Sequence, residues 1–459
     1  MKSDFGYHGS WQEVLRLAIP MVISNASWTL QHFVDRMFLS WYSITSVQAV
    51  MPAGICAFTA ACIFIGLAGY SNTFVAQYDG AGAPRRIGAV IWHSIYIAIA
   101  SAIILIPTIW LAKPLFEFSG NRPEVVSQEI IYFRIMMIGA FLPIVQAGLA
   151  SFYTGRGKTW TLVMINVVIT AVNLVLDYAM IFGRLGCPEM GIAGAAWATI
   201  IAEVVGLVIY LILLFQRRNR NLYGTLSGWR PDRELLWRMI RFGLPNGVQV
   251  LIDVGGFTVF ILLLGRLSDI EQAATNIAFT INNLSFMPML GVATAVTTLV
   301  GKYIGMGKPE FAARATINAY RLTCIYMVVI GLVFVLLSSP LYELFRPRTG
   351  TGSAQEFAKI KGVGATLLMF IAFYNFFDAM NFVFASALRG AGDTKFVMWM
   401  LLCLSSLCFV VPSWIAIRIF NTSIYTMWTI ATIYLCILGS CFYLRYRAGY
   451  WQKMRVIEM

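Results

Sequence analysis

The chain has 459 residues, of which 59% are hydrophobic and only 12% carry a charge. A water-soluble domain is normally about 25% charged because its surface must be solvated, so this composition excludes a secreted, disordered or nucleic-acid-binding globule. The formal net charge of +13 therefore needs another explanation, which the positions of the basic residues provide.

Apolar segments long enough to cross a bilayer recur along the whole chain. A membrane-spanning helix needs roughly 20 mostly apolar residues. The first six such segments fall at 15–38, 49–73, 90–112, 131–154, 160–182 and 192–215. Six more fall at 241–265, 275–299, 318–338, 363–387, 396–417 and 424–444. Because the runs are continuous rather than alternating, they predict an all-α integral membrane protein with twelve helices and not a β-barrel.

A polar, arginine-rich connection divides the twelve segments into two sets of six. We expect an N-lobe at 1–216, a cytoplasmic linker at 217–240 and a C-lobe at 241–459. Each lobe has an even number of spans, so both enter the membrane in the same sense. The arrangement predicts two six-helix lobes related by a pseudo-two-fold axis along the membrane normal.

The two halves also repeat one another in sequence. Equivalent positions lie 225 residues apart: Pro20 and Pro245, Gly66 and Gly291, Gly82 and Gly307, Pro84 and Pro309. Closely spaced glycines can wrap a phosphate, but neither glycine turn is followed by the lysine and hydroxyl residue of a nucleotide-binding loop. We interpret both as tight turns in which glycine supplies a positive φ.

The basic residues predict the orientation. With twelve spans, both termini and every even-numbered connection lie on one side, which carries 22 of the 34 lysines and arginines. The positive-inside rule assigns that side to the cytoplasm. The sequence therefore predicts a multi-pass protein of the cell's inner (plasma) membrane with both termini cytoplasmic. Contact with anionic lipid is a further expectation, and nucleic acid is not an expected partner.

Carboxyl groups inside the predicted spans are the strongest functional signal. An ionised side chain in mid-membrane costs roughly 2.5–3.5 kcal/mol, so each must be protonated, ion-bound, paired or hydrated. Five of the 21 acids fall there: Asp35, Asp177, Glu203, Asp253 and Asp378. A purely structural alternative is that each pairs with Arg36, Arg134 or Arg321.

Each acid has a polar companion on the same helix face. The pairs are His32 with Asp35, Asn173 with Asp177, Thr199 with Glu203, Gln249 with Asp253, and Tyr374 with Asp378. Residues three or four apart are neighbours on a helix, so these oxygen-rich faces can hold a hard monovalent cation or a shared proton. For His32, helix packing and proton relay are both open.

At this point the ordered motifs resemble the multidrug and toxic compound extrusion (MATE) transporters. The segments that carry the resemblance are Leu17 to Met21, Val34 to Asp35, Asn173 to Asp177, Gly194 to Thr199 and Leu388 to Thr394, together with both glycine turns. The resemblance covers essentially the whole chain. It implies a two-lobed antiporter that exports organic compounds, often cationic, in exchange for sodium ions or protons.

The resemblance also assigns residues. The family's N-lobe ion site maps onto Asp35, Asn173, Asp177 and Thr199, where either Na⁺ or H⁺ is expected. The NorM-like branch adds a C-lobe site that maps onto Asp253, Tyr374 and Asp378. The first of these is usually glutamate in that branch, so the shorter Asp253 is a departure. Candidate auxiliary residues are His32, Glu203 and Gln249.

An aromatic and methionine lining would suit flat hydrophobic cations. Phe286, Met287 and Met289 are the candidates for it, with ordinary helix packing as the alternative. The expected function is therefore cation-coupled export of small organic molecules by alternating access. We expect no cofactor beyond the coupling ion, and a monomer among membrane lipids.

Two other functions fit the sequence less well. A flippase for a lipid-linked precursor would be expected to line its cavity with cations, whereas the spans hold five acids against three arginines. An intramembrane hydrolase would need a catalytic motif, and the chain has three histidines, no HExxH and no GxSxG. The sequence therefore predicts a transporter and not an enzyme.

Overall fold

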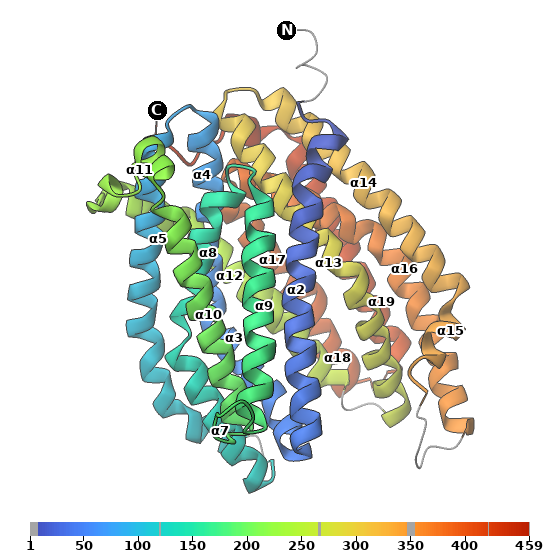
Figure 1. Ribbon diagram of the computed structural model, residues 1–459. Helices are drawn as coiled ribbons and strands as arrows, with labels where there is room; N and C mark the ends of the chain where they lie inside the picture. Colours follow the sequence, from blue (N-terminus) through green and yellow to red (C-terminus); the bar gives the residue numbers. More distant parts are fainter. Residues whose placement is uncertain (1–7, 119–120, 265–267, 347–353, 421, 459) are drawn as a thin grey trace. The chain divides into compact units, whose positions relative to one another are not determined.

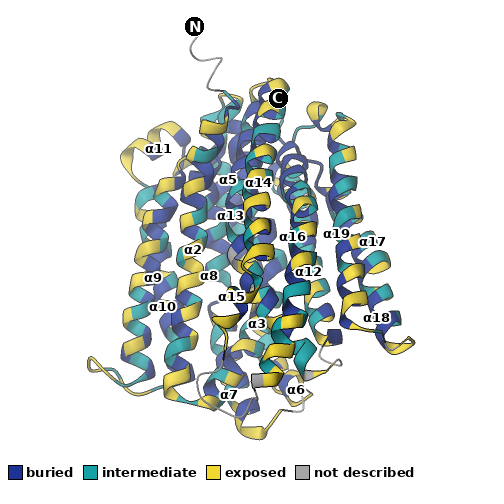
Figure 2. Ribbon diagram, turned by 90° about the vertical axis from the view of Figure 1, so that its right-hand side faces the viewer, coloured by how far each residue is buried: buried dark blue, intermediate teal, exposed yellow. Residues whose placement is uncertain are grey.

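The computed structural model describes residues 8–118, 121–264, 268–346, 354–420 and 422–458 (Figure 1). Within these ranges every regular element is a helix. This is what a bilayer demands of continuous apolar runs, since each backbone N–H and C=O must find its partner inside the same segment. Exposed residues recur along the outer faces of α9, α10 and α14, as expected for surfaces that meet lipid (Figure 2).

The helices follow one another with short connections. The first half contains α2 (Trp11–Tyr42), α3 (Ile44–Gly69), α4 (Ser71–Gly80), α5 (Pro84–Leu105), η1 (Ile106–Leu111), α6 (Ala112–Glu117), α7 (Pro123–Ile138), α8 (Phe141–Thr154), α9 (Thr159–Ile181) and α10 (Ile192–Leu214). After α11 (Arg217–Tyr223) and η2 (Ser227–Trp229) come α12 (Arg233–Leu264), α13 (Asp269–Gly305), α14 (Pro309–Leu336), α15 (Ser338–Glu343), α16 (Ala354–Ala391), α17 (Thr394–Leu404), η3 (Ser405–Val410), α18 (Val411–Arg418), α19 (Ile424–Arg447) and η4 (Tyr450–Lys453).

The predicted all-α membrane fold is confirmed. Each of the twelve predicted segments falls on one helix or on helices joined end to end. In the described chain ten helices are long and apolar enough to span a membrane, and the bent pair α7–α8 makes eleven. The remaining predicted segment is α2, which has 32 residues but carries polar side chains that lower its hydropathy.

The bend of 41° between α7 and α8 has a local cause. Gly139 ends α7, and Pro143 lies in the first turn of α8. A proline has no N–H to donate to the carbonyl four residues earlier, and its ring crowds that carbonyl, so the helix cannot continue straight. The sequence window at 131–154 predicted one span but gave no reason to expect it to be straight.

The chain forms two compact units, which we describe separately. One comprises Met1–Val22, Ile252–Val300 and Lys308–Met454, and the other comprises Ile23–Leu251, Gly301–Gly307 and Arg455–Met459. Helices α2, α12 and α13 therefore contribute residues to both units. The lobe boundaries at 216 and 241 follow the sequence repeat and stay a prediction.

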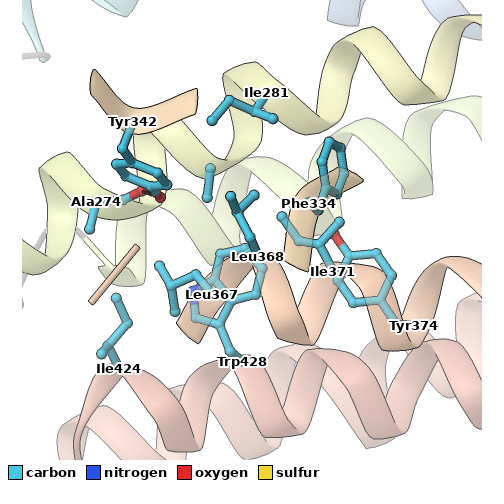
Figure 3. Packing of buried hydrophobic residues seen from close by; sticks show 11 residues of the cluster. Ala274, Ile281, Phe334, Tyr342, Leu367, Leu368, Ile371, Tyr374, Ile424 and Trp428 are labelled. Carbon is cyan, nitrogen blue, oxygen red and sulfur yellow. Dashed lines mark hydrogen bonds between the residues drawn. The ribbon is translucent and has the colours of Figure 1, made fainter. Parts of the chain in front are cut away.

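The first unit has a hydrophobic core formed by α13, α14, α15, α16 and α19 (Figure 3). The indole of Trp428 is 1% exposed and stacks on Phe279 with ring centroids 5.1 Å apart. The hydroxyl of Tyr342 donates to the carbonyl of Ala274 at 2.8 Å, which satisfies the one polar group that its burial brings inside. Tyr374 lies at the edge of this cluster, beside Ile371.

Close backbone contacts in the second unit follow the 225-residue repeat. A Cβ atom added to Gly80 would overlap the carbonyl oxygen of Lys302, and one added to Gly305 would overlap that of Gln77. Gly80 and Gly305 are equivalent positions, and so are Gln77 and Lys302. The end of α4 thus packs on the end of α13 through two equivalent contacts, each requiring a residue without a side chain.

A second pair of equivalent glycines also packs directly against backbone atoms. A Cβ at Gly66 would lie 2.6 Å from Cα of Gly247 in the second unit. A Cβ at the equivalent Gly291 would lie 2.9 Å from the backbone nitrogen of Val22 in the first unit, and Val22 is the equivalent of Gly247. The predicted glycine turns are also confirmed, since φ is +69° at Gly82 and +70° at Gly307.

An ionic network joins α5 and α12 to the C-terminal segment. Arg86 contacts Asp232 at 3.0 Å and Glu458 at 3.1 Å, and Arg238 contacts Glu458 at 3.2 Å. Asp232 also begins α12, because its Oδ1 accepts the backbone N–H groups of Glu234 and Leu235, each at 3.1 Å. The Leu235 N–H and the Arg86 guanidinium hold the pKa of Asp232 below its usual value.

We expect Asp232→Asn to lower the thermal midpoint at pH 7, and this difference to shrink as the pH falls below about 4. A depressed pKa adds stability above the unfolded value of about 3.9, and this is lost as the pH falls through the lower folded value. The amide can still cap α12, so the variant removes only the ion pair, worth roughly 0.2–1 kcal/mol. Thermal unfolding in detergent measures the midpoint of both proteins. A difference between their midpoints that does not change with pH would contradict the ion pair of Asp232 as its cause.

Candidate functional site

Helices α2 and α9 face each other through a seam of polar side chains. Asn166 on α9 donates to the hydroxyl of Ser24 on α2, and the hydroxyl of Thr170 donates to the carbonyl of Ser27 at 3.4 Å. Positions 166, 170, 173 and 177 are spaced by four, three and four, so they share one face of α9. The seam leads along both helices to the carboxyl groups predicted from the sequence.

Asn173 holds Asp35 and Asp177 together. With its amide nitrogen turned toward them, it donates to Asp35 Oδ1 at 2.9 Å and to Asp177 Oδ2 at 3.2 Å. This orientation is assigned from the hydrogen-bond network, because the opposite one would face the amide oxygen toward two acceptors. The two carboxyl groups are also hydrogen-bonded to each other. A bond between two carboxyl groups requires a proton on one of them.

Among the described residues, no arginine lies within 4 Å of this pair. The ion-pair contact of Asp35 is with His32 Nδ1 at 3.8 Å, and Arg36 attracts Asp35 only from a greater distance. Asp35 is 6% exposed and Asp177 is fully buried, with its Oδ1 lacking a hydrogen-bond partner. Arg36 itself is exposed. A buried acid pair with no arginine in direct contact among the described residues is an arrangement that a proton or cation would stabilise.

The structure places the companion residues around this pair in different ways. His32 packs edge-on against the indole of Trp28, with centroids 4.4 Å apart, which agrees with a packing role. The hydroxyl of Thr199 donates to the carbonyl of Ala195 on its own helix, at 3.0 Å. Tyr132 on α7 is buried and lies within electrostatic range of both carboxyl groups. Sequence spacing missed Tyr132 because Asp35 and Asp177 lie on other helices, and Glu129, the acid three residues earlier on α7, fell outside the predicted span.

Two further acids lie in the same unit. Gln146 on α8 donates to the carbonyl of Glu203 at 2.7 Å and is hydrogen-bonded to its carboxyl group. Glu203 therefore pairs with an amide, and no described arginine lies within ion-pair distance of it. Glu129 is fully buried in α7 and accepts the amide of Asn121 at 2.9 Å. The predicted span began at residue 131, and so this sixth acid was missed.

A second polar cluster lies on α16 in the other unit. The amide of Asn282 on α13 donates to the hydroxyl of Tyr374 at 3.3 Å, and Ser285 donates to Asn282 Oδ1 at 3.0 Å. The amide of Asn381 donates to Asp378 Oδ1 at 3.3 Å. Asp378 is 6% exposed. The predicted pairing of Tyr374 with Asp378 is thus extended by two asparagines that sequence spacing did not identify.

Asp253 on α12 differs from the other acids because it is exposed. Its electrostatic neighbours are the guanidinium of Arg389, which attracts it, and Asp378, which repels it. The hydroxyl of Tyr434 lies within range of both acids. Asp253, Asp378 and Tyr374 therefore belong to one electrostatic group. Gln249, one turn before Asp253, is buried.

The candidate lining residues of α13 divide between burial and partial exposure. Met289 is 2% exposed and packs with Met327 and Ala379 in a core cluster, and Phe286 meets Phe382 edge-on at 4.8 Å beside them. Both agree with the helix-packing alternative. Met287 is partly exposed. Among the described residues no group of three or more His, Cys, Asp or Glu is arranged to hold a metal ion.

Comparison with known protein families decides the assignment. The MatE family profile matches residues 20–179 and again residues 245–415. The chain belongs to the MatE family. The two matches begin 225 residues apart, which confirms the internal repeat found from the glycine and proline positions. MatE proteins are transporters, so the expectation that this chain is not an enzyme is confirmed.

Several characterised or named relatives share most of the chain. A probable multidrug resistance protein NorM of Thermotoga maritima is 28% identical over 386 residues, which is 83% of this chain and 80% of that protein. Multidrug resistance protein PmpM of Pseudomonas aeruginosa is 27% identical over 396 residues, which is 85% of this chain and 80% of that protein. The MATE resemblance and its NorM-like character are thereby confirmed.

Solved structures agree on the fold of this MatE protein. A multidrug resistance MATE family transporter in an outward-facing conformation aligns with a TM-score of 0.86 at 22% identity, covering 97% of both chains. A MOP superfamily transporter from Pyrococcus furiosus aligns with a TM-score of 0.85 at 23% identity, also covering 97% of both chains. These similarities support the predicted twelve-helix architecture.

Proposed function

We propose that this MatE protein is a cation-coupled antiporter that exports hydrophobic, often cationic, organic compounds by alternating access. The observation that carries the proposal is the buried pair of Asp35 and Asp177, which Asn173 joins and which no arginine of the described chain contacts within 4 Å. A structural acid pair would have a fixed counter-charge. A coupling site must instead be able to take up and release a positive charge in each transport cycle.

The mechanism is competition for negative charge. When the pair is ionised, it produces a negative potential that favours a cationic substrate. At an effective dielectric constant of 20, a unit charge 4 Å away contributes about 4 kcal/mol. Binding of the coupling cation neutralises the pair, removes that attraction and permits tighter packing of α2 on α9. The organic cation is then released while the coupling cation is carried inward.

The orientation of Asn173 supports a proton as the coupling cation. A sodium ion needs several oxygen ligands, and the amide of Asn173 turns its nitrogen to the carboxyl groups. Thr199 likewise uses its hydroxyl proton within its own helix. A proton shared by Asp35 and Asp177 needs neither the amide oxygen of Asn173 nor the hydroxyl oxygen of Thr199 as a ligand. Sodium coupling requires the amide to turn over, and remains the alternative that the experiment below separates.

The test is ethidium efflux from proteoliposomes containing the purified protein, under an imposed pH gradient or an imposed sodium gradient. Efflux driven by the pH gradient at constant sodium supports proton coupling. Efflux driven only by the sodium gradient would instead identify sodium as the coupling ion. Absence of efflux under both gradients contradicts the antiporter and favours a flippase for a lipid-linked precursor. Reconstituted protein of both orientations is compared with empty vesicles.

The proposed setting is the plasma membrane, with both termini in the cytoplasm. The chain is a multi-pass membrane protein by its helices, and the distribution of its 34 basic residues supports this orientation. We propose that it acts as a monomer on small organic substrates, with lipids as its surroundings. A reporter that is active only in the cytoplasm should be active when fused after Met459. Activity of a reporter that works only outside the cytoplasm would show the opposite orientation.

Asp253 gives a separate prediction about substrate charge. Because it is exposed and lies beside Asp378, we expect it to attract cationic substrates directly. Asp253→Asn should weaken transport of ethidium about tenfold, corresponding to roughly 1.4 kcal/mol, while a neutral substrate is affected less than twofold. Asp253→Glu, which restores the family's usual residue, should retain ethidium transport. Equal losses for charged and neutral compounds would contradict direct attraction.

A further inference from the structure

A groove of about 690 Å³ lies in the first unit, between the start of α2 and the first turns of α14. Its lining includes Ser10, Trp11, Arg314, Ile317, Asn318 and Arg321. The amide of Asn318 donates to the carbonyl of Gly9 at 2.8 Å, which fixes the start of α2 against α14. The groove is therefore built by a specific contact and is distant in sequence from every residue assigned to ion coupling.

The charged residues that line the groove are two arginines. Arg314 and Arg321 are both exposed and stand two turns apart, about 10 Å along the axis of α14. Arg321 has no carboxylate within ion-pair distance among the described residues. It lies twelve residues after Pro309, about 18 Å into the helix, where an uncompensated cation is costly. An anion in the groove would remove that cost.

The surface beyond the arginines is apolar. Ile325, Val328, Leu332 and Leu336 are 54% to 74% exposed. Their spacing from Arg321 is four, three, four and four, so they continue the same face of α14. At the other end of the groove, Trp11 is 54% exposed, as is typical of an indole at the membrane interface. If the phosphate of a phospholipid contacts the arginines, its acyl chains lie along this apolar stripe.

We propose that this groove binds the headgroup of an anionic phospholipid of the inner leaflet. Arg314 and Arg321 bind the phosphate and Asn318 lines the floor between them, while the acyl chains follow the exposed stripe of α14. The guanidinium group suits this task because its planar donors match two phosphate oxygens and its charge is permanent. The start of α14 is on the predicted cytoplasmic side, where anionic lipids face basic pockets. The inference does not depend on the coupling ion or the exported compound.

The test is native mass spectrometry of the full-length, delipidated protein with three probes: dioctanoyl phosphatidylglycerol, dioctanoyl phosphatidylcholine and inorganic phosphate. We expect phosphatidylglycerol to bind at least tenfold more tightly than either of the others. The double variant Arg314→Gln/Arg321→Gln should lose at least tenfold in affinity for phosphatidylglycerol. Arg418→Gln, which removes an exposed arginine elsewhere in the same unit, should leave that affinity unchanged.

Each other result would overturn the proposal. Equal binding of the zwitterionic lipid would mean that the apolar stripe alone retains lipid. Equal binding of inorganic phosphate would mean that the groove takes a free anion. An unchanged affinity in the double variant, with an unchanged thermal midpoint as proof of folding, would place the lipid elsewhere.

Discussion

Asp35→Asn is expected to reduce ion-driven ethidium efflux at least a hundredfold, to the leak rate of empty vesicles, without loss of folded protein. The amide keeps the size of the carboxyl group, so the packing of α2 on α9 is preserved. It cannot release or bind a proton, and with Asp177 alone the site can no longer share one. A hundredfold loss corresponds to about 2.7 kcal/mol of coupling free energy. Initial efflux rates in proteoliposomes under a pH gradient measure it.

Glu203→Gln is the matched control for this variant. It also replaces a carboxyl group by an amide in the second unit, but Glu203 is held by Gln146 and not by the Asp35–Asp177 pair. We expect efflux within threefold of the unmodified protein. Normal ion-driven export by Asp35→Asn would contradict the coupling site. An equal loss in both variants would show that any buried acid of this unit is needed, which would remove the special status of the pair.

Gly80→Leu is expected to separate the ends of α4 and α13. A Cβ at this position would overlap the carbonyl oxygen of Lys302, which is backbone and cannot rotate away. The two helix ends must then move apart by more than 1 Å, and the conformation described here should become a minor one. The proposed alternating-access cycle passes through this state, so we expect efflux to fall at least tenfold.

The separation is measurable by electron paramagnetic resonance between spin labels at two exposed positions, Ala81→Cys and Met306→Cys, after replacement of the native cysteines. We expect a longer and broader distance distribution in Gly80→Leu. Gly362→Leu is the control, because its added atoms meet open space. If Gly80→Leu leaves both the distance distribution and efflux unchanged, this contact is not needed for the cycle.

Sequence reasoning predicted the features that depend on one helix at a time. The spans follow from continuous hydrophobicity, and the polar faces of α9 and α16 follow from spacings of three and four. Asn173 and Asp177 could be paired in this way before any coordinates were known. The positive φ at Gly82 and Gly307 likewise follows from the local turn alone.

What sequence reasoning could not predict are the contacts between helices. Tyr132 beside the acid pair, and Asn282 bonded to Tyr374, come from helices whose own patterns carry no matching signal. Rotation of each helix about its axis decides such contacts, and packing of whole faces sets that rotation. The same uncertainty affected α13, where hydrophobicity alone did not distinguish the buried Met289 from the partly exposed Met287.

The paired glycine contacts carry a consequence for the symmetry of the chain. Gly80 touches Lys302, and Gly305 touches Gln77, with each partner standing at the equivalent position of the other half. Reciprocal contact of this kind defines an isologous interface between identical subunits. A homodimer of a half-length chain would form both contacts from one glycine position used twice. Away from this contact the two halves differ, since one carries Asn173 with two buried aspartates and the other carries Tyr374 with Asp378.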